Sequence, residues 1–141
     1  MSMLSHYPAD SLTVVVLTNV EADDNDVFFV EQRVARAALG LPEPADLPFD
    51  SASARRLAGT YRGGGVEARV TVERGRLTAL ITGANRMAFL FPLPLLSQGG
   101  GTFLSSRDTS TRLHFTPSAA PSSLTVATPD GRRYDLGRAA Q

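Results

Sequence analysis

The sequence predicts a mainly β protein, in which an eight-stranded antiparallel up-and-down barrel follows a β-hairpin and one α-helix. Apolar and polar residues alternate without interruption over Val66–Glu73, which is the period of a half-buried strand. Arg74-Gly75 turns the chain and Arg76–Thr82 leads back, as in a hairpin. Short runs of this kind continue to the C-terminus, with joins so short that neighbouring strands must be antiparallel. Strands in this number most simply close into a barrel, which has no exposed edge.

The composition is typical of a soluble globular protein and excludes several kinds of chemistry. The 141 residues are 43% hydrophobic and 20% charged, and a net charge of +0 attracts neither nucleic acid nor an anionic membrane. All 14 basic residues are arginine, so a lysine base, a Schiff base and a phosphate-binding lysine are excluded. The absence of cysteine excludes disulfides, thiol catalysis and cysteine-ligated zinc.

The N-terminal residues predict a hairpin and then a helix. Pro8–Ser11 has turn chemistry, and Leu12–Thr18 is almost wholly apolar, as in a strand that is covered on both faces. A helix is predicted from about Asp26 to Leu39, and Gly40 is placed to end it in a left-handed conformation. We expect its apolar face to contain Val27, Val30, Val34, Ala37, Ala38 and Leu41, with Glu31, Gln32, Arg33 and Arg36 away from it.

A proline-rich segment separates this part from the barrel. Prolines in residues 42–50 favour a stiff, extended linker. We therefore expect a hairpin and helix at 1–41, the linker at 42–50 and the barrel domain at 51–141. Asp50 or Ser51 is placed to cap a short helical turn at the start of that domain.

Turn compositions rich in Gly, Pro, Asp and Asn divide the rest of the chain into eight predicted strands. These strands are Leu57–Arg62, Val66–Glu73, Arg76–Thr82, Met87–Leu93, Thr102–Arg107, Thr111–Thr116, Ser123–Thr128 and Arg132–Arg138. The inward-facing positions are mostly large residues, so we expect a filled or nearly filled barrel. A pocket in its interior would be lined by Tyr61, Phe89, Phe91, Phe103, Phe115 and Tyr134.

Residues 6–19, His6-Tyr7-Pro8-Ala9-Asp10-Ser11-Leu12-Thr13-Val14-Val15-Val16-Leu17-Thr18-Asn19, resemble the end of the penicillin-recognising serine hydrolases. That superfamily includes class C β-lactamases, DD-peptidases and esterases, and its last hairpin is followed by a C-terminal helix like the predicted one. Leu57-Ala58-Gly59-Thr60-Tyr61-Arg62 is similar to the first strand of the lipocalin-like domain that is often appended to these enzymes. Phe91-Pro92-Leu93, Leu113-His114-Phe115 and residues 129–134 fit that domain too. The resemblance implies that the chain is the C-terminal part of such a hydrolase.

The catalytic residues of that superfamily have no counterpart in this chain. Its nucleophile motif is Ser-x-x-Lys, and the chain has no lysine. Its second motif is Tyr-x-Asn, whereas Tyr7, Tyr61 and Tyr134 are followed two places on by other residues. The third motif, a Lys or His followed by x-Gly, is not supplied by His6. We therefore expect the chain itself to have no catalytic residues and no enzyme activity.

The remaining chemical candidates have simpler structural interpretations. His114 is expected on the outer surface of its strand, and two histidines alone do not make a zinc site. Asp23, Asp24 and Asp26 are better suited to helix capping than to binding calcium. The two Gly triplets join strand to strand without a lysine, unlike a phosphate loop, and Arg132-Arg133 fits a solvated hairpin. No cofactor and no metal is therefore expected.

Three functions remain open: an accessory module of a serine hydrolase, a barrel that binds a small apolar ligand, and an independent enzyme. The accessory module would cover the active site or mediate oligomerisation. We expect a homodimer through the hairpin and helix, or binding to a hydrolase domain in trans, and no nucleic acid or membrane partner. The interface with that partner would include Leu12, Val14, Val16, Phe28 and Phe29. The alternative is that the helix and hairpin fold back onto the barrel wall of the same chain, at Leu80 and Leu90. No signal peptide is recognisable, so the chain as it stands is expected in the cytoplasm, although a parent enzyme could be exported.

Overall fold

The computed structural model describes residues 1–19, 27–83, 92–107, 109–116 and 121–140. Within these ranges, Phe28 is described by its backbone alone. The chain forms two compact units, Met1–Pro44 and Ala45–Gln141. The predicted linker at 42–50 is thus divided, and its second half belongs to the barrel unit.

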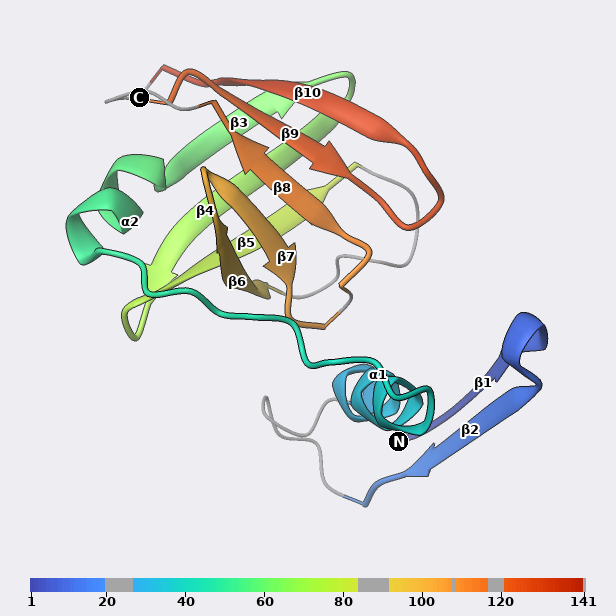
Figure 1. The fold of residues 1–141 in the computed structure, drawn as a ribbon. Coiled ribbons are helices and arrows are strands. Elements are labelled where there is room, and N and C mark those ends of the chain that lie inside the picture. The colour runs from blue at the N-terminus through green and yellow to red at the C-terminus, as the bar shows by residue number, and fades with distance from the viewer. Residues whose placement is uncertain (20–26, 84–91, 108, 117–120, 141) are drawn as a thin grey trace. The chain divides into compact units, whose positions relative to one another are not determined.

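The second unit is a closed antiparallel barrel of eight strands, which confirms the predicted fold class (Figure 1). Each strand pairs with its neighbours in sequence, and the last strand closes the ring by pairing with the first. The strands are β3 (Gly59–Gly63), β4 (Val66–Glu73), β5 (Arg76–Thr82), β6 (Leu93–Gly99), β7 (Thr102–Ser105), β8 (Arg112–Phe115), β9 (Ser123–Ala127) and β10 (Arg133–Arg138).

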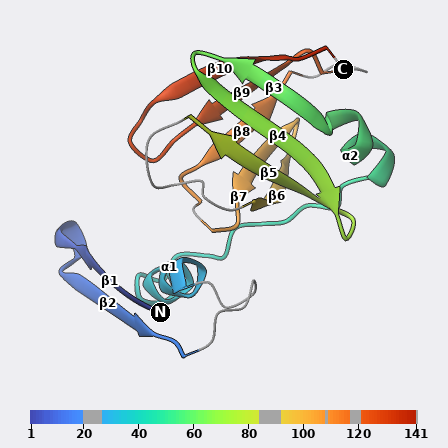
Figure 2. The ribbon, with the colours of Figure 1, turned by 180° about the vertical axis from the view of Figure 1, so that it is seen from behind.

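Local sequence signals explain the best-predicted parts of the barrel. Arg74 and Gly75 both have positive φ, 49° and 81°, as a tight hairpin turn between β4 and β5 requires. A short helix, α2 (Ser51–Leu57), precedes β3 at one end of the barrel, as both views show (Figures 1 and 2). Its N-cap is Asp50, whose carboxylate accepts from the backbone N–H groups of Ala52 at 3.1 Å and Ser53 at 3.0 Å.

The structure corrects two strand boundaries. Leu57 ends α2 and does not begin a strand, although its side chain is buried in the core. The strand that follows β5 is Leu93–Gly99, and most of the predicted strand Met87–Leu93 lies outside the described residues. Pro92 and Pro94 obscured this strand in the sequence, because proline is uncommon within sheets.

The first unit is a two-stranded sheet with one helix on it (Figure 1). Strands β1 (Ser2–Tyr7) and β2 (Leu12–Leu17) are joined by a 3-10 turn, η1 (Pro8–Asp10). The helix α1 (Val27–Ala38) ends as predicted at Gly40, which has φ 66°. The N–H of Leu41 donates to the carbonyl of Arg36 at 2.9 Å, which satisfies one of the last free carbonyls of the helix.

The buried face of α1 differs from the predicted one. Val27, Glu31 and Ala35 are almost fully buried, with exposures of 1%, 2% and 3%. Val34 and Leu41, which were expected on the buried face, are 47% and 49% exposed. The helix is therefore rotated from the predicted orientation, and much of its apolar stripe faces solvent.

Candidate functional site

The outer face of the hairpin is an exposed apolar surface. Leu4, Val15 and Leu17 are 70%, 59% and 79% exposed, and Leu4 lies directly across from Val15. The other side chains on this face are Ser2, His6 and Thr13, and the face carries no Asp, Glu, Lys or Arg. An apolar sheet face of this kind is typical of a surface that another protein element covers.

The opposite face of the same strands is the core of the unit. Val14 and Val16 are buried beneath α1, and Leu12 packs against the same cluster. The structure therefore places three of the predicted interface residues inside the unit, because α1 covers the face on which they lie. Phe29 is half-buried, and the guanidinium carbon of Arg33 lies 5.5 Å from the centre of the Phe29 ring. The side chain of Phe28, the fifth predicted interface residue, lies outside the described part.

Strand β2 also has an open edge. Met1 and Thr18 exchange two hydrogen bonds, of 2.7 Å and 3.0 Å, so these two residues are a hydrogen-bonded pair of the antiparallel ladder. Because such pairs alternate along a ladder, the backbone groups of Thr13, Val15 and Leu17 point toward the other edge of β2. No strand within the described ranges pairs with that edge. Edges of this kind invite pairing with a further strand.

The exposed side of α1 is a second apolar surface of the same unit. Val34, Ala37 and Ala38 are exposed on one stripe of the helix, and the exposed Leu41 follows just beyond its C-terminal end. We call this group the helix stripe, and Leu4, Val15 and Leu17 the sheet patch. The hairpin and helix thus have apolar surfaces on both outer sides of their small core.

A buried polar pair joins α1 to β1. The hydroxyl of Tyr7 donates to Oε1 of the buried Glu31 at 2.7 Å. Burial raises the pKa of Tyr7 to about 12, and the hydrogen bond to Glu31 and the charge of Glu31 act in the same direction. Sequence reasoning missed this pair, because a Glu on a helix is usually solvated.

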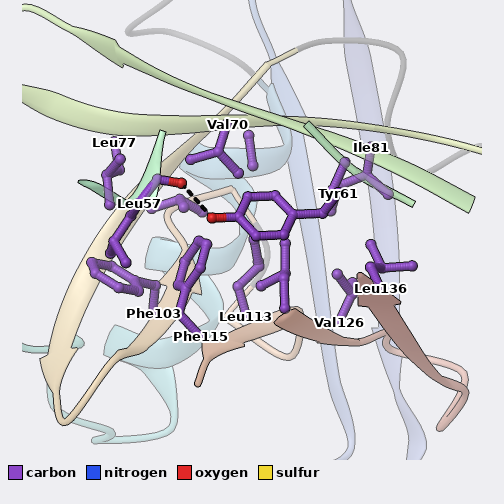
Figure 3. Packing of buried hydrophobic residues seen from close by; sticks show 14 of the residues in the cluster. Leu57, Tyr61, Val70, Leu77, Ile81, Phe103, Leu113, Phe115, Val126 and Leu136 are labelled. Atoms are coloured by element: carbon purple, nitrogen blue, oxygen red, sulfur yellow. Dashed lines mark hydrogen bonds between the residues drawn. The ribbon is translucent and has the colours of Figure 1, made fainter. Parts of the chain in front are cut away.

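The predicted pocket residues that the structure describes are parts of a packed barrel core. Tyr61, Phe103 and Phe115 are almost fully buried, and Tyr134 packs against the same cluster from the rim. Figure 3 shows the Tyr61 ring lying across the interior, with its hydroxyl directed at the carbonyl of Leu57 at 2.8 Å. Phe89 and Phe91 lie outside the described residues. Large side chains therefore occupy the described interior, as expected for a filled barrel.

Arg138 holds the α2 end of the barrel together. Its guanidinium donates to the carbonyls of Arg56 at 2.9 Å and Ala58 at 2.6 Å, which end the helix. It also lies over the Tyr61 ring, with its central carbon 5.8 Å from the ring centre. Gly59 permits this approach, because a Cβ there would lie 3.2 Å from the guanidinium. The contact brings together residues about 80 positions apart, and no local pattern in the sequence signals it.

The titratable candidates that the structure describes are the two histidines. His6 and His114 are exposed, and each bonds at 2.9 Å to the threonine opposite, Thr13 and Thr102 respectively. Among the described residues, no three His, Asp or Glu side chains are placed to hold a metal ion. Asp23, Asp24 and Asp26 lie outside that set. None of the described helices is long and apolar enough to cross a membrane.

Comparison with known proteins leaves the family open. No protein-family model matches the chain, and no curated protein is significantly similar to it.

Proposed function

We propose that this chain is a non-catalytic accessory module of a β-lactamase-related serine hydrolase of the peptidase or esterase class. In this proposal the hairpin and helix dock on the hydrolase domain, and the barrel covers its active site or mediates oligomerisation. The observation that carries the proposal is the pair of apolar surfaces on the N-terminal unit, the sheet patch and the helix stripe.

The N-terminal unit has too little core for an independent domain. Among its described residues, the core cluster contains four buried apolar side chains, Val14, Val16, Val27 and Ala35. A two-stranded sheet is marginally stable by itself in water, and one helix covers only one of its faces. Such a unit is better explained as the end of a larger sheet than as a complete fold.

The character of β2 favours a sheet as the partner. Its residues are apolar on both faces, which is typical of strands in the interior of a sheet that has layers on both sides. Strand β1 carries Ser2 and His6 on its outer face and is more like an edge strand. A partner strand is therefore expected along the open edge of β2. The resemblance of residues 6–19 to the last hairpin of the serine hydrolases supplies the candidate partner.

The alternative function, binding of a small apolar ligand in the barrel, needs interior space. The described interior positions hold Tyr61, Phe103 and Phe115, so a ligand of lipid size has no room among them. The accessory role does not depend on such space, and we therefore prefer it.

Reactivity toward serine-directed reagents tests the non-catalytic part. The unmodified chain should form no covalent adduct with a fluorophosphonate or with benzylpenicillin, as read by intact mass, because it has no Ser-x-x-Lys. Stoichiometric labelling of one serine would contradict the proposal.

Docking is tested with the hydrolase itself. The proposal expects Ser-x-x-Lys and Tyr-x-Asn in the sequence encoded directly upstream of Met1. That hydrolase domain, purified alone, should bind the full chain, and Val15→Asp and Val34→Asp should each abolish binding by placing a charge on a docking surface. Val72→Asp is the matched control, since Val72 is an exposed apolar residue of the barrel. Equal binding by all four chains would rule out docking through this unit.

A further inference from the structure

Among the described residues of the barrel unit, the aromatic ring of Phe49 comes from outside the strands. Phe49 lies in a segment without helix or strand, and its ring packs edge-to-face on Phe103 at 5.1 Å between centroids. Phe103 packs in the same way on Phe115 at 5.6 Å, and Phe115 on Tyr61 at 5.6 Å. The four rings form a column that runs from the half-buried Phe49 to the fully buried Tyr61.

The segment Ala45–Phe49, which we call the strap, contacts both β5 and β6. These two strands are paired only at Thr78–Pro94 and Ala79–Leu93 among the described residues. Asp46 spans the two strands, since its carboxylate accepts from the backbone N–H of Ser97 in β6 at 3.0 Å and lies 3.4 Å from Arg76 in β5. The N–H of Leu47 donates to the carbonyl of Ser97 at 2.9 Å.

The strap is held less firmly than Phe103 and Phe115, the residues against which the Phe49 ring packs. Phe103 and Phe115 belong to paired strands and are almost fully buried. The strap is held by the two hydrogen bonds to the backbone of the buried Ser97 and by an ion pair between side chains that are 63% and 36% exposed. Water can replace the exposed ion pair at little cost, and neither hydrogen bond belongs to a ladder between two strands. Lifting the strap would therefore withdraw one ring and leave its aromatic wall in place.

We propose that the position of the Phe49 ring is a binding site for a small, uncharged aromatic molecule, which Phe49 occupies until the strap lifts. The ligand class follows from the rings of Phe103 and Phe115, because edge-to-face packing on Phe103 selects a flat ring. It must be uncharged, because the buried polar residues of this unit within the described ranges are Thr78, Ser97, Ser105 and Thr111. None of these neutralises a buried charge.

Titration of the full chain with fluorobenzene, followed by ¹⁹F NMR, tests the proposal. The chain should bind one equivalent, and binding should release the N–H of Leu47 from protection against hydrogen exchange. Asp46→Ala keeps the ring but removes the contacts to Ser97 and Arg76, so it should bind about tenfold more tightly because the open state is more populated. The matched control Leu47→Ala changes an exposed side chain of the strap and should bind like the unmodified chain.

Phe49→Ala and a charged probe complete the test. Phe49→Ala removes the competing ring and should bind at least as tightly as Asp46→Ala, with Phe49→Leu as the substitute if the alanine variant does not fold by circular dichroism. 4-Fluorobenzoate should not bind. The proposal is overturned if Asp46→Ala and the unmodified chain bind fluorobenzene equally, if the folded Phe49 variant binds none, or if fluorobenzoate binds as well as fluorobenzene. These results do not depend on the N-terminal unit, so they separate this site from the docking proposal.

Discussion

The two units of this chain bury apolar surface with very different success. The barrel has 17 buried apolar residues in its core cluster, whereas the N-terminal unit has four within the described part of the chain. Among the described residues, six of the eight exposed large hydrophobic side chains belong to the N-terminal unit, and Leu47 and Val72 belong to the barrel unit. The shorter unit therefore exposes most of the described large apolar side chains that water contacts.

The difference follows from how each sheet ends. A closed barrel pairs every strand on both sides, so its inward residues are enclosed without help from another chain. A two-stranded sheet has two edges and two faces, and α1 covers only one face. The barrel encloses its own core, whereas no described residue covers the outer face of the hairpin or pairs with the free edge of β2.

Separating the units should have the largest effect. A fragment of residues 45–141 should fold to an all-β structure and unfold cooperatively, because it retains the strap, α2 and the closed sheet. A fragment of residues 1–44 should show no cooperative thermal transition by circular dichroism. A short fragment that melts cooperatively as a monomer, or an unfolded barrel fragment, would contradict this difference between the units.

Within the barrel, Arg138 should matter more than other surface arginines. Arg138→Met should lower the free energy of unfolding by about 2 kcal/mol, because three carbonyls, including Pro121, lose a charged donor. Arg133→Met is the matched control on the same strand, since the Arg133 side chain is 70% exposed and lies 3.9 Å from Asp135. It should cost less than about 0.5 kcal/mol. If both variants lose the same free energy of unfolding in urea denaturation, Arg138 does not hold the α2 end of the barrel together.

Alkaline pH should loosen the N-terminal unit through Tyr7. The pKa of Tyr7 is raised from 10.0 to about 12 in the folded chain, so the stability that it contributes is complete below pH 10. That contribution is lost as the pH rises through 12, because the phenolate cannot donate to Glu31. The difference in absorbance at 295 nm between the unmodified chain and Tyr7→Phe isolates this titration.

The position of the midpoint decides whether the Tyr7–Glu31 pair is formed in solution. A midpoint near pH 12 is expected for the unmodified chain. Glu31→Gln should bring it part of the way back to 10.0, because burial of the ring remains after the charge is removed. A midpoint near 10.0 in the unmodified chain would show that the pair does not form.

Much of the barrel was predictable because its signals are local. Period-2 alternation and glycine turns marked most of the strands, and Asp50 and Gly40 marked helix ends. Leu93–Gly99 was the exception, since its prolines imitate a loop. The two-part organisation was predictable from the prolines between the units.

The surfaces were harder to predict because they depend on which face of each element is covered. The alternation of β2 gave its two apolar faces but not the one that α1 would cover, so Val14 and Val16 were expected at the interface in place of Leu4 and Leu17. The rotation of α1 was hidden by the charge of Glu31, whose partner Tyr7 lies 24 residues away. Phe49 gave one usable signal, which is a large aromatic residue in a proline-rich segment.

Light scattering shows directly whether the uncovered sheet face of the N-terminal unit binds another protein surface. Without a hydrolase domain, a second copy is the nearest element that can cover the sheet patch, and a two-fold pair is the commonest solution. The unmodified chain and the barrel control Val72→Asp should be dimers at high concentration, and Val15→Asp should be a monomer. A monomeric unmodified chain under those conditions would contradict the account of an unpartnered apolar face.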